Sequence, residues 1–281
     1  MNGRLQIWPT LREAYTIFFT ELPTFLRIGI KPFVCLFALM GLFTVLKIQS
    51  PGSFSLTLLI SVLALIFIGA LALSPFAVSC HRLVLAGERP ETRYFFRMFR
   101  RREIQFAKFA VFLTFVGFSP LILGEALNVW IWAELRATGS SFLTEHSLVD
   151  IVIRFLLVLS VLPLALYLVR FVFVFPQTAM DERATLPLSA KQTRNVRWRL
   201  LSIFVLVDMP FILSEVILRK VIISSLDNWP WALIADAMHV MLYLLNSAIL
   251  AVAISLTFRI RVLGHEAGAF VRRAERVARV P

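Results

Sequence analysis

The chain has 281 residues, of which 59% are hydrophobic and only 16% are charged. Its mean hydropathy of +0.80 lies outside the range of soluble globular domains and predicts a protein that folds in lipid. A net charge of +12 would suit nucleic-acid binding on a soluble basic face, but here the charges lie between long apolar runs. We therefore do not expect nucleic acid to be a partner.

Residues 10–27 come first and place apolar side chains at helical spacing among polar ones. This pattern predicts an amphipathic helix in the membrane interface. Thr10 and Glu13 have the spacing of a capping box at its start, and Pro23 is expected to end or kink it.

Six apolar stretches follow, each long enough to cross a hydrocarbon core of about 30 Å as a helix. We expect these spans over residues 28–48, 54–80, 106–130, 148–175, 198–223 and 231–258. The fold class is therefore predicted to be all-α, with one transmembrane domain.

Lysine and arginine are divided unequally between the segments that join these spans. Segments 1–31, 81–108, 170–199 and 259–281 hold 24 of the 29 basic residues. The other five are Lys47, Arg136, Arg154, Arg219 and Lys220. Because cytoplasmic loops retain Lys and Arg during insertion, we expect both termini in the cytoplasm of a bacterial inner-membrane protein. Residues 259–281 would then form a basic cytoplasmic tail.

Two later cytoplasmic segments repeat the idea of an amphipathic helix before a pair of spans. In the first, a stripe of arginines is expected to contact anionic lipid headgroups: Arg93, Arg97, Arg100 and Arg101. The alternative is that these arginines serve only to fix topology. In the second, Ser189 and Gln192 have the spacing of a capping box. The chain thus reads as three units, each an amphipathic segment followed by a hairpin of two spans.

The third unit carries a resemblance to a known family. Residues 175–182 read FPQTAMDE, residues 187–194 read PLSAKQTR, and residues 197–201 read RWRLL. An apolar span that ends at a proline, an acidic residue, and a basic helix leading into the next span resemble YciC-like bacterial membrane proteins. The pattern is also similar to the membrane domain attached to some glycerophosphodiester phosphodiesterases. The resemblance implies six helices and no catalytic residues, although Arg183 stands where the family has a glycine turn.

Ionisable residues inside apolar spans are costly and therefore invite a functional hypothesis. The candidates for an intramembrane polar site are Glu125, Arg154, Asp208, Glu215, Asp236 and His239. One hypothesis is an outward-opening polar cavity in which Arg154 balances a carboxylate and His239 relays protons or binds an anion. The alternative, which we favour, is a set of polar contacts between helices near the outer interface. Asp208 is the sharpest case, since it precedes Pro210 within a span.

No catalytic, phosphate-binding or metal-binding pattern is found, so we expect no enzyme and no cofactor. Cys35 and Cys80 lack further ligands at metal spacing and are expected to be small buried hydrophobes. Ser247, Ala251 and Ser255 form a row of small residues suited to helix packing. The first functional hypothesis is a non-enzymatic membrane component that contacts lipid or binds a membrane-protein partner or a second copy. The second is a small transporter or channel that uses Asp208 and the outer polar cluster.

Overall fold

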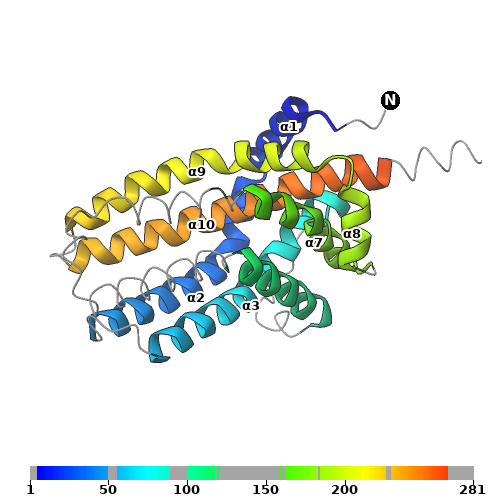
Figure 1. Cartoon of the computed structure of the whole chain (residues 1–281). Helices are drawn as coiled ribbons and strands as arrows, with labels where there is room; N and C mark the ends of the chain where they lie inside the picture. The colour runs from blue at the N-terminus through cyan, green and yellow to red at the C-terminus, as the bar shows by residue number, and fades with distance from the viewer. Residues whose placement is uncertain are drawn as a thin grey trace, which may run out of the picture.

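The computed structural model describes residues 5–49, 56–88, 100–117, 119, 159, 162–182, 184–225 and 229–264. Every element within these ranges is a helix, as Figure 1 shows, which confirms the predicted all-α fold class for this part of the chain. Five helical segments among them are long and apolar enough to cross a membrane: Leu22–Leu42, Ile66–Ala86, Leu162–Ala179, Arg197–Leu218 and Leu233–Leu263. The chain therefore has the character of a multi-pass membrane protein. The expected third span is described over residues 106–117 and at 119, and its other residues lie outside the described ranges.

The first two long helices are α2 (Leu22–Gln49) and α3 (Leu56–Ala86), which pack against each other. Both are longer than the expected spans, because a helix does not have to end where its apolar residues end. Helix α3 continues past Cys80 until Gly87, which has a φ of 66°. Glycine reaches this left-handed conformation without steric cost and commonly ends helices. His81 and Arg82 are consequently part of a membrane helix and not of a loop.

The amphipathic segment expected over residues 10–27 is divided between two helices. Helix α1 (Ile7–Thr20) begins three residues before Thr10, whose hydroxyl donates to the Gln6 carbonyl at 2.6 Å and caps nothing. A bend at Glu21 separates α1 from α2. Pro23 lies in the first turn of α2, where the missing backbone N–H costs little stability because it would have no partner in the helix. Helix α1 packs against α9 and α10, and its buried residues are Thr10, Ala14 and Phe18. The tyrosine of α1, Tyr15, donates to the Val207 carbonyl at 3.2 Å.

Helix α10 (Trp229–Phe258) lies at the centre of the bundle. It packs against α9 (Arg197–Ser225) and also against α1, α2 and α3. Its buried residues, among them Leu244, Ala248 and Val252, form most of the core. Large apolar side chains on α9 point outward instead: Val205, Met209, Ile212, Leu213, Val216 and Ile217. An apolar exterior of this extent is stable in lipid and not in water.

Two short helices lie near one end of the bundle, where α1 and the last turns of α10 also lie (Figure 1). We call this end of the bundle, where α1, the two short helices and the last turns of α10 lie, the basic end. A helix over 162–168 continues through the 3₁₀ helix η2 (Val169–Phe171) to α7 (Val174–Ala179), and α8 (Leu186–Thr193) then docks on η2. The hydroxyls of Ser189 and Thr193 donate to the Arg170 carbonyl at 2.9 and 3.0 Å. Ser189 is thus a docking residue inside α8, and the cap of that helix is Thr185, which accepts from the Leu188 amide at 3.4 Å.

Candidate functional site

A cavity of about 440 Å³ lies between α2, α3 and α10, with helix 101–117 and α7 near the basic end. Its lining is overwhelmingly apolar and includes Leu36, Met40, Ile66, Leu73, Val240 and Leu250. Small residues on facing helices leave the space open, among them Gly69, Ala70, Ala110 and Ala251. The row of small residues on α10 therefore has two roles. Ala251 is almost fully buried in the helix packing, yet together with Ser247 it also lines this cavity.

Three ring side chains line the cavity toward the basic end: His81 of α3, Phe106 of helix 101–117 and Phe175 of α7. The ring centroids of Phe106 and Phe175 are 4.8 Å apart, and those of His81 and Phe106 are 5.9 Å apart. We call these residues the aromatic layer. They come from three segments that are distant in the sequence. Beside them, Val78, Phe106 and Ala179 of the same segments pack into one buried apolar cluster.

His81 is the polar member of the aromatic layer. Only 2% of the residue is exposed, and its Nδ1 lies 2.7 Å from the hydroxyl oxygen of Ser255 on α10. Ser255 is fully buried and forms no other side-chain hydrogen bond with the residues that the structure describes. Polar groups buried between apolar helices need hydrogen-bond partners in place of water. His81 and Ser255 are such partners for each other.

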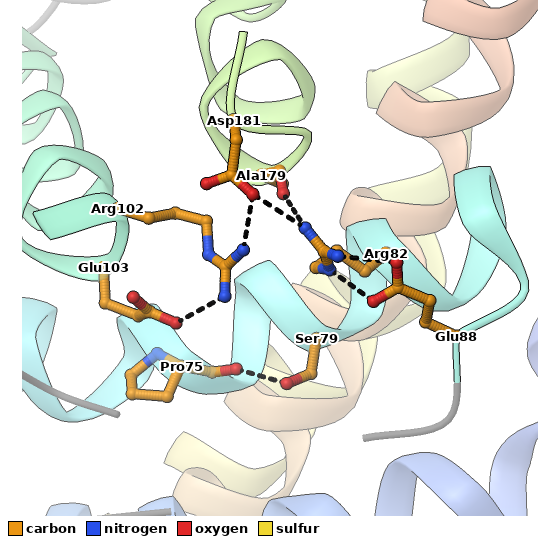
Figure 2. A network of polar contacts seen from close by, with 8 residues as sticks. All are labelled: Pro75, Ser79, Arg82, Glu88, Arg102, Glu103, Ala179 and Asp181. Atoms are coloured by element: carbon orange, nitrogen blue, oxygen red, sulfur yellow. Dashed lines mark hydrogen bonds and ion pairs between the residues drawn. The ribbon is translucent and has the colours of Figure 1, made fainter. Parts of the chain in front are cut away.

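A cluster of charged residues, shown in Figure 2, connects α3, helix 101–117 and the turn after α7. The Nη1 atoms of Arg82 and Arg102 lie 3.1 and 2.9 Å from the same atom, Oδ2 of Asp181. Arg82 comes from α3, Arg102 from helix 101–117, and Asp181 from the turn after α7. We call these three residues the arginine layer. Asp181 has a φ of 60°, a left-handed conformation that aspartate and asparagine tolerate better than most residues.

Each arginine is held on its other side by a carboxylate of its own. Arg82 donates from Nε and Nη2 to the two oxygens of Glu88, at 2.7 and 2.6 Å. Arg102 donates from Nη2 to Glu103, whose side chain is completely buried, at 3.2 Å. A bidentate or buried partner fixes the plane of a guanidinium group. Both arginines therefore present Nη1 toward one point, where the exposed carboxylate of Asp181 lies.

The aromatic and arginine layers lie close together along the same three segments of the chain. Arg102 precedes Phe106 by four residues, Ala179 follows Phe175 by four residues, and Arg82 follows His81 directly. Four residues of helix correspond to a rise of about 6 Å. The Ala179 carbonyl also accepts from Nη1 of Arg82 at 3.0 Å, which ties the end of α7 to α3. The cavity, the buried imidazole and the two arginines thus follow one another along the bundle axis.

Of the intramembrane candidates that the structure describes, only His239 lines this cavity. Asp208 of α9 accepts a short hydrogen bond from the Asn246 amide of α10, at the interface of those two helices. His239 lines the cavity, whereas its neighbour Asp236 does not, and neither does Glu215. Asp208 also helps to raise the pKa of Tyr15, although burial of the phenol contributes more. Glu125 and Arg154 lie outside the described residues.

The arginine stripe is described only in part, because Arg93 and Arg97 lie outside the described residues. Arg100 and Arg101 are exposed at the start of helix 101–117. The next residue, Arg102, is the one whose side chain turns inward, with 14% of it exposed. Sequence reasoning therefore found the segment but missed the residue that contacts the rest of the molecule.

His81, Arg82 and Asp181 were missed for a related reason. With the second span ended at Cys80, a histidine and an arginine directly after it were interpreted as loop residues. The available signal was the run from His81 to Ala86, which stays apolar after Arg82 and allows one more turn of helix. Asp181 lies within the stretch that carries the family resemblance, but its contact with two distant arginines has no signal in a single sequence.

The described residues contain no group of three or more His, Cys, Asp or Glu side chains that could hold a metal ion. Cys35 and Cys80 are free thiols, and Cys80 is fully buried. Comparisons with protein-family models, with curated proteins and with solved structures gave no match. The site must therefore be interpreted from its own chemistry.

Proposed function

We propose that the chain is a six-span protein of the bacterial inner membrane, with both termini in the cytoplasm, and that it binds a membrane lipid. The observation that carries this proposal is the cavity between α2, α3 and α10. Its volume of about 440 Å³ is in the range of ligand-binding pockets, which is roughly 300–1,000 Å³. Its walls are helices apolar enough to cross the bilayer, so the molecules that reach it most easily are lipids.

The composition of the lining supports an acyl chain as the occupant. Aliphatic side chains from α2, α3 and α10 provide the walls, and few polar atoms interrupt them. Apolar cavities hold water poorly, because a water molecule needs two to four polar partners. A hydrocarbon chain, in contrast, fills such a space with favourable dispersion contacts.

A hydrolytic role is a weaker proposal, although a histidine lies beside a serine. Ser255 is fully buried and does not line the cavity, so its hydroxyl oxygen has no path to a bound ester. A nucleophile has to reach the reacting carbon, and here the imidazole stands between serine and cavity. We therefore propose binding without catalysis, and no cofactor.

A transport role receives less support than lipid binding. A transport path would bring ionisable groups together around water, whereas Asp208 pairs with Asn246 and only His239 of the described candidates reaches the cavity. Membership of the YciC-like family stays a prediction. The same holds for a membrane-protein partner or a second copy of the chain.

Lipid retention by two matched variants tests the proposal. Ala70→Phe places a ring in the cavity from α3, whereas Ala38→Phe adds the same ring at an exposed position of α2 that does not line the cavity. The full chain and both variants would be purified in the same detergent and their bound lipids counted by native mass spectrometry. We expect the wild type and Ala38→Phe to retain lipid and Ala70→Phe to lose it. Equal retention by all three proteins would contradict the proposal.

A further inference from the structure

The polar groups at the basic end of the cavity specify which lipid it accepts, an inference that rests on the proposed function. We propose that the ligand is an anionic phospholipid of the leaflet at the basic end. Its acyl chain lies in the cavity, an ester carbonyl accepts a hydrogen bond from His81, and its phosphate binds between Arg82 and Arg102 in place of Asp181.

The hydrogen bond to Ser255 determines what His81 offers to a ligand. The two atoms are 2.7 Å apart, and because Ser255 has no other acceptor among the described residues, we infer that its hydroxyl donates to Nδ1. In a neutral imidazole one nitrogen accepts and the other carries the proton, so Nε2 is the N–H donor. Nε2 forms no hydrogen bond with the described residues, and the ring lines the cavity. Because the ring lines the cavity, a lipid ester carbonyl inside the cavity can accept a hydrogen bond from Nε2.

The arginine layer has the geometry of a site for one anion. Two Nη1 atoms converge on a single oxygen, Oδ2 of Asp181, while Glu88 and Glu103 fix the other edges of the guanidinium groups. Among these contacts the two arginines meet three carboxylates, and Asp181 supplies the single negative charge that both arginines share. A phosphodiester carries one negative charge and can therefore replace Asp181 without changing the balance.

Asp181 is suited to being displaced. Its side chain is 61% exposed, whereas those of Arg82 and Arg102 are 19% and 14% exposed. Ion pairs with an exposed partner contribute little to stability, because water solvates the free carboxylate well. The arginines remain in place when Asp181 leaves, since Glu88 and Glu103 still hold them.

The order of the groups matches the order of groups in a phospholipid. The arginine layer lies one helical turn, about 6 Å, beyond the aromatic layer along helix 101–117 and α7. In a phospholipid the phosphate is joined through glycerol to the ester carbonyls, and the acyl chains follow. The phosphate then contacts Arg82 and Arg102, the ester carbonyl contacts His81, and the hydrocarbon contacts the apolar walls.

The experiment is a lipid titration of the delipidated full chain, followed by native mass spectrometry. Phosphatidylglycerol and phosphatidylcholine with the same acyl chains are compared, so that only the headgroup differs. We expect the wild type to prefer phosphatidylglycerol, because both lipids carry the phosphodiester but the choline cation of phosphatidylcholine is repelled by Arg82 and Arg102. Glycerol 3-phosphate in millimolar excess should not displace it, because the acyl chain contributes to binding; displacement would assign the arginines to a free phosphate and overturn the inference.

Asp181→Asn separates a headgroup site from a purely structural ion pair. Asparagine tolerates the left-handed conformation and removes the competing charge, so the preference for phosphatidylglycerol should rise by about threefold. A structural pair would give an unchanged or lower preference, which would overturn the inference. Glu13→Gln removes a charge from the separate pair with Arg259 and should leave the preference as in the wild type.

Arg82→Gln supplies the opposite change. It should lower the preference for phosphatidylglycerol by about fivefold; it also removes the partner of the half-exposed Glu88 and the hydrogen bond to the Ala179 carbonyl. If Ala70→Phe abolishes binding of both lipids while neither Asp181→Asn nor Arg82→Gln alters the preference, the cavity holds lipid but the headgroup inference is wrong. If Ala70→Phe has no effect on either lipid, the proposed function itself is wrong.

Discussion

His81 on α3 and Ser255 on α10 face each other between two membrane helices, with Nδ1 of the histidine 2.7 Å from the serine hydroxyl oxygen. The bond joins the wall of the cavity to the central helix of the bundle. It also sets which nitrogen of the imidazole faces a ligand. In the proposed lipid site, loss of this hydrogen bond would therefore alter ligand binding.

Ser255→Ala should destabilise the folded chain by about 1–3 kcal/mol, because it removes the hydrogen-bond partner of a buried imidazole nitrogen. Thermal unfolding in detergent, followed by circular dichroism, measures the effect. The control is Ser247→Ala, whose hydroxyl donates to the Tyr243 carbonyl of its own helix at 2.8 Å. Equal small shifts in melting temperature for both variants would show that the hydrogen bond with His81 stabilises the fold no more than the one Ser247 makes within its helix.

Arg102→Gln should destabilise the chain by about 3 kcal/mol, because it removes the cation paired with the fully buried Glu103. The double variant Arg102→Gln with Glu103→Gln should recover much of this loss, since it removes the buried charge as well. Chemical unfolding in mixed micelles gives the free energies for the comparison. A double variant less stable than the single one would contradict the pairing.

Tyr15→Phe should loosen the docking of α1 by about 1 kcal/mol, because it deletes the bond from the phenol to the Val207 carbonyl. Hydrogen exchange of the α1 amides should accelerate while that of α10 stays unchanged. Tyr167→Phe is the control, as its ring is exposed beside Arg170 and is remote from α1 in sequence. Identical exchange in α1 for both variants would count against the docking role.

Asp208→Asn should leave growth and solute uptake as in the wild type, because the side chain serves a contact with Asn246 between α9 and α10. An asparagine at this position can still accept from the amide of Asn246. Uptake assays in cells that depend on the chain provide the measurement. Loss of uptake with normal protein levels would favour the transport hypothesis over lipid binding.

The six-span topology predicts opposite labelling of two connections. In a chain without Cys35 and Cys80, a cysteine replacing Thr138 should react with a membrane-impermeant maleimide on intact cells. A cysteine replacing Lys191, in α8 near the basic end, should react only after the membrane is opened. The reverse labelling would contradict the orientation that the lysine and arginine distribution predicts.

The long helices could be predicted because twenty apolar residues in a row have few other stable conformations. Their ends could not, since a charged residue such as Arg82 is accepted within a membrane helix near its end when carboxylates pair with it. The amphipathic character of α1 was also readable, but not that its buried face packs on α9 and α10. The candidate site was largely missed, because His81, Arg102 and Asp181 meet only through contacts between segments distant in the sequence.

Photo-crosslinking with an anionic phospholipid that carries a diazirine near the end of one acyl chain measures where that chain binds. If the acyl chain occupies the cavity, we expect adducts on residues that line it, such as Met40 and Ile66, and their loss in Ala70→Phe. Adducts confined to outward positions such as Ile212 and Ile217 of α9, unchanged by Ala70→Phe, would contradict this placement of the acyl chain.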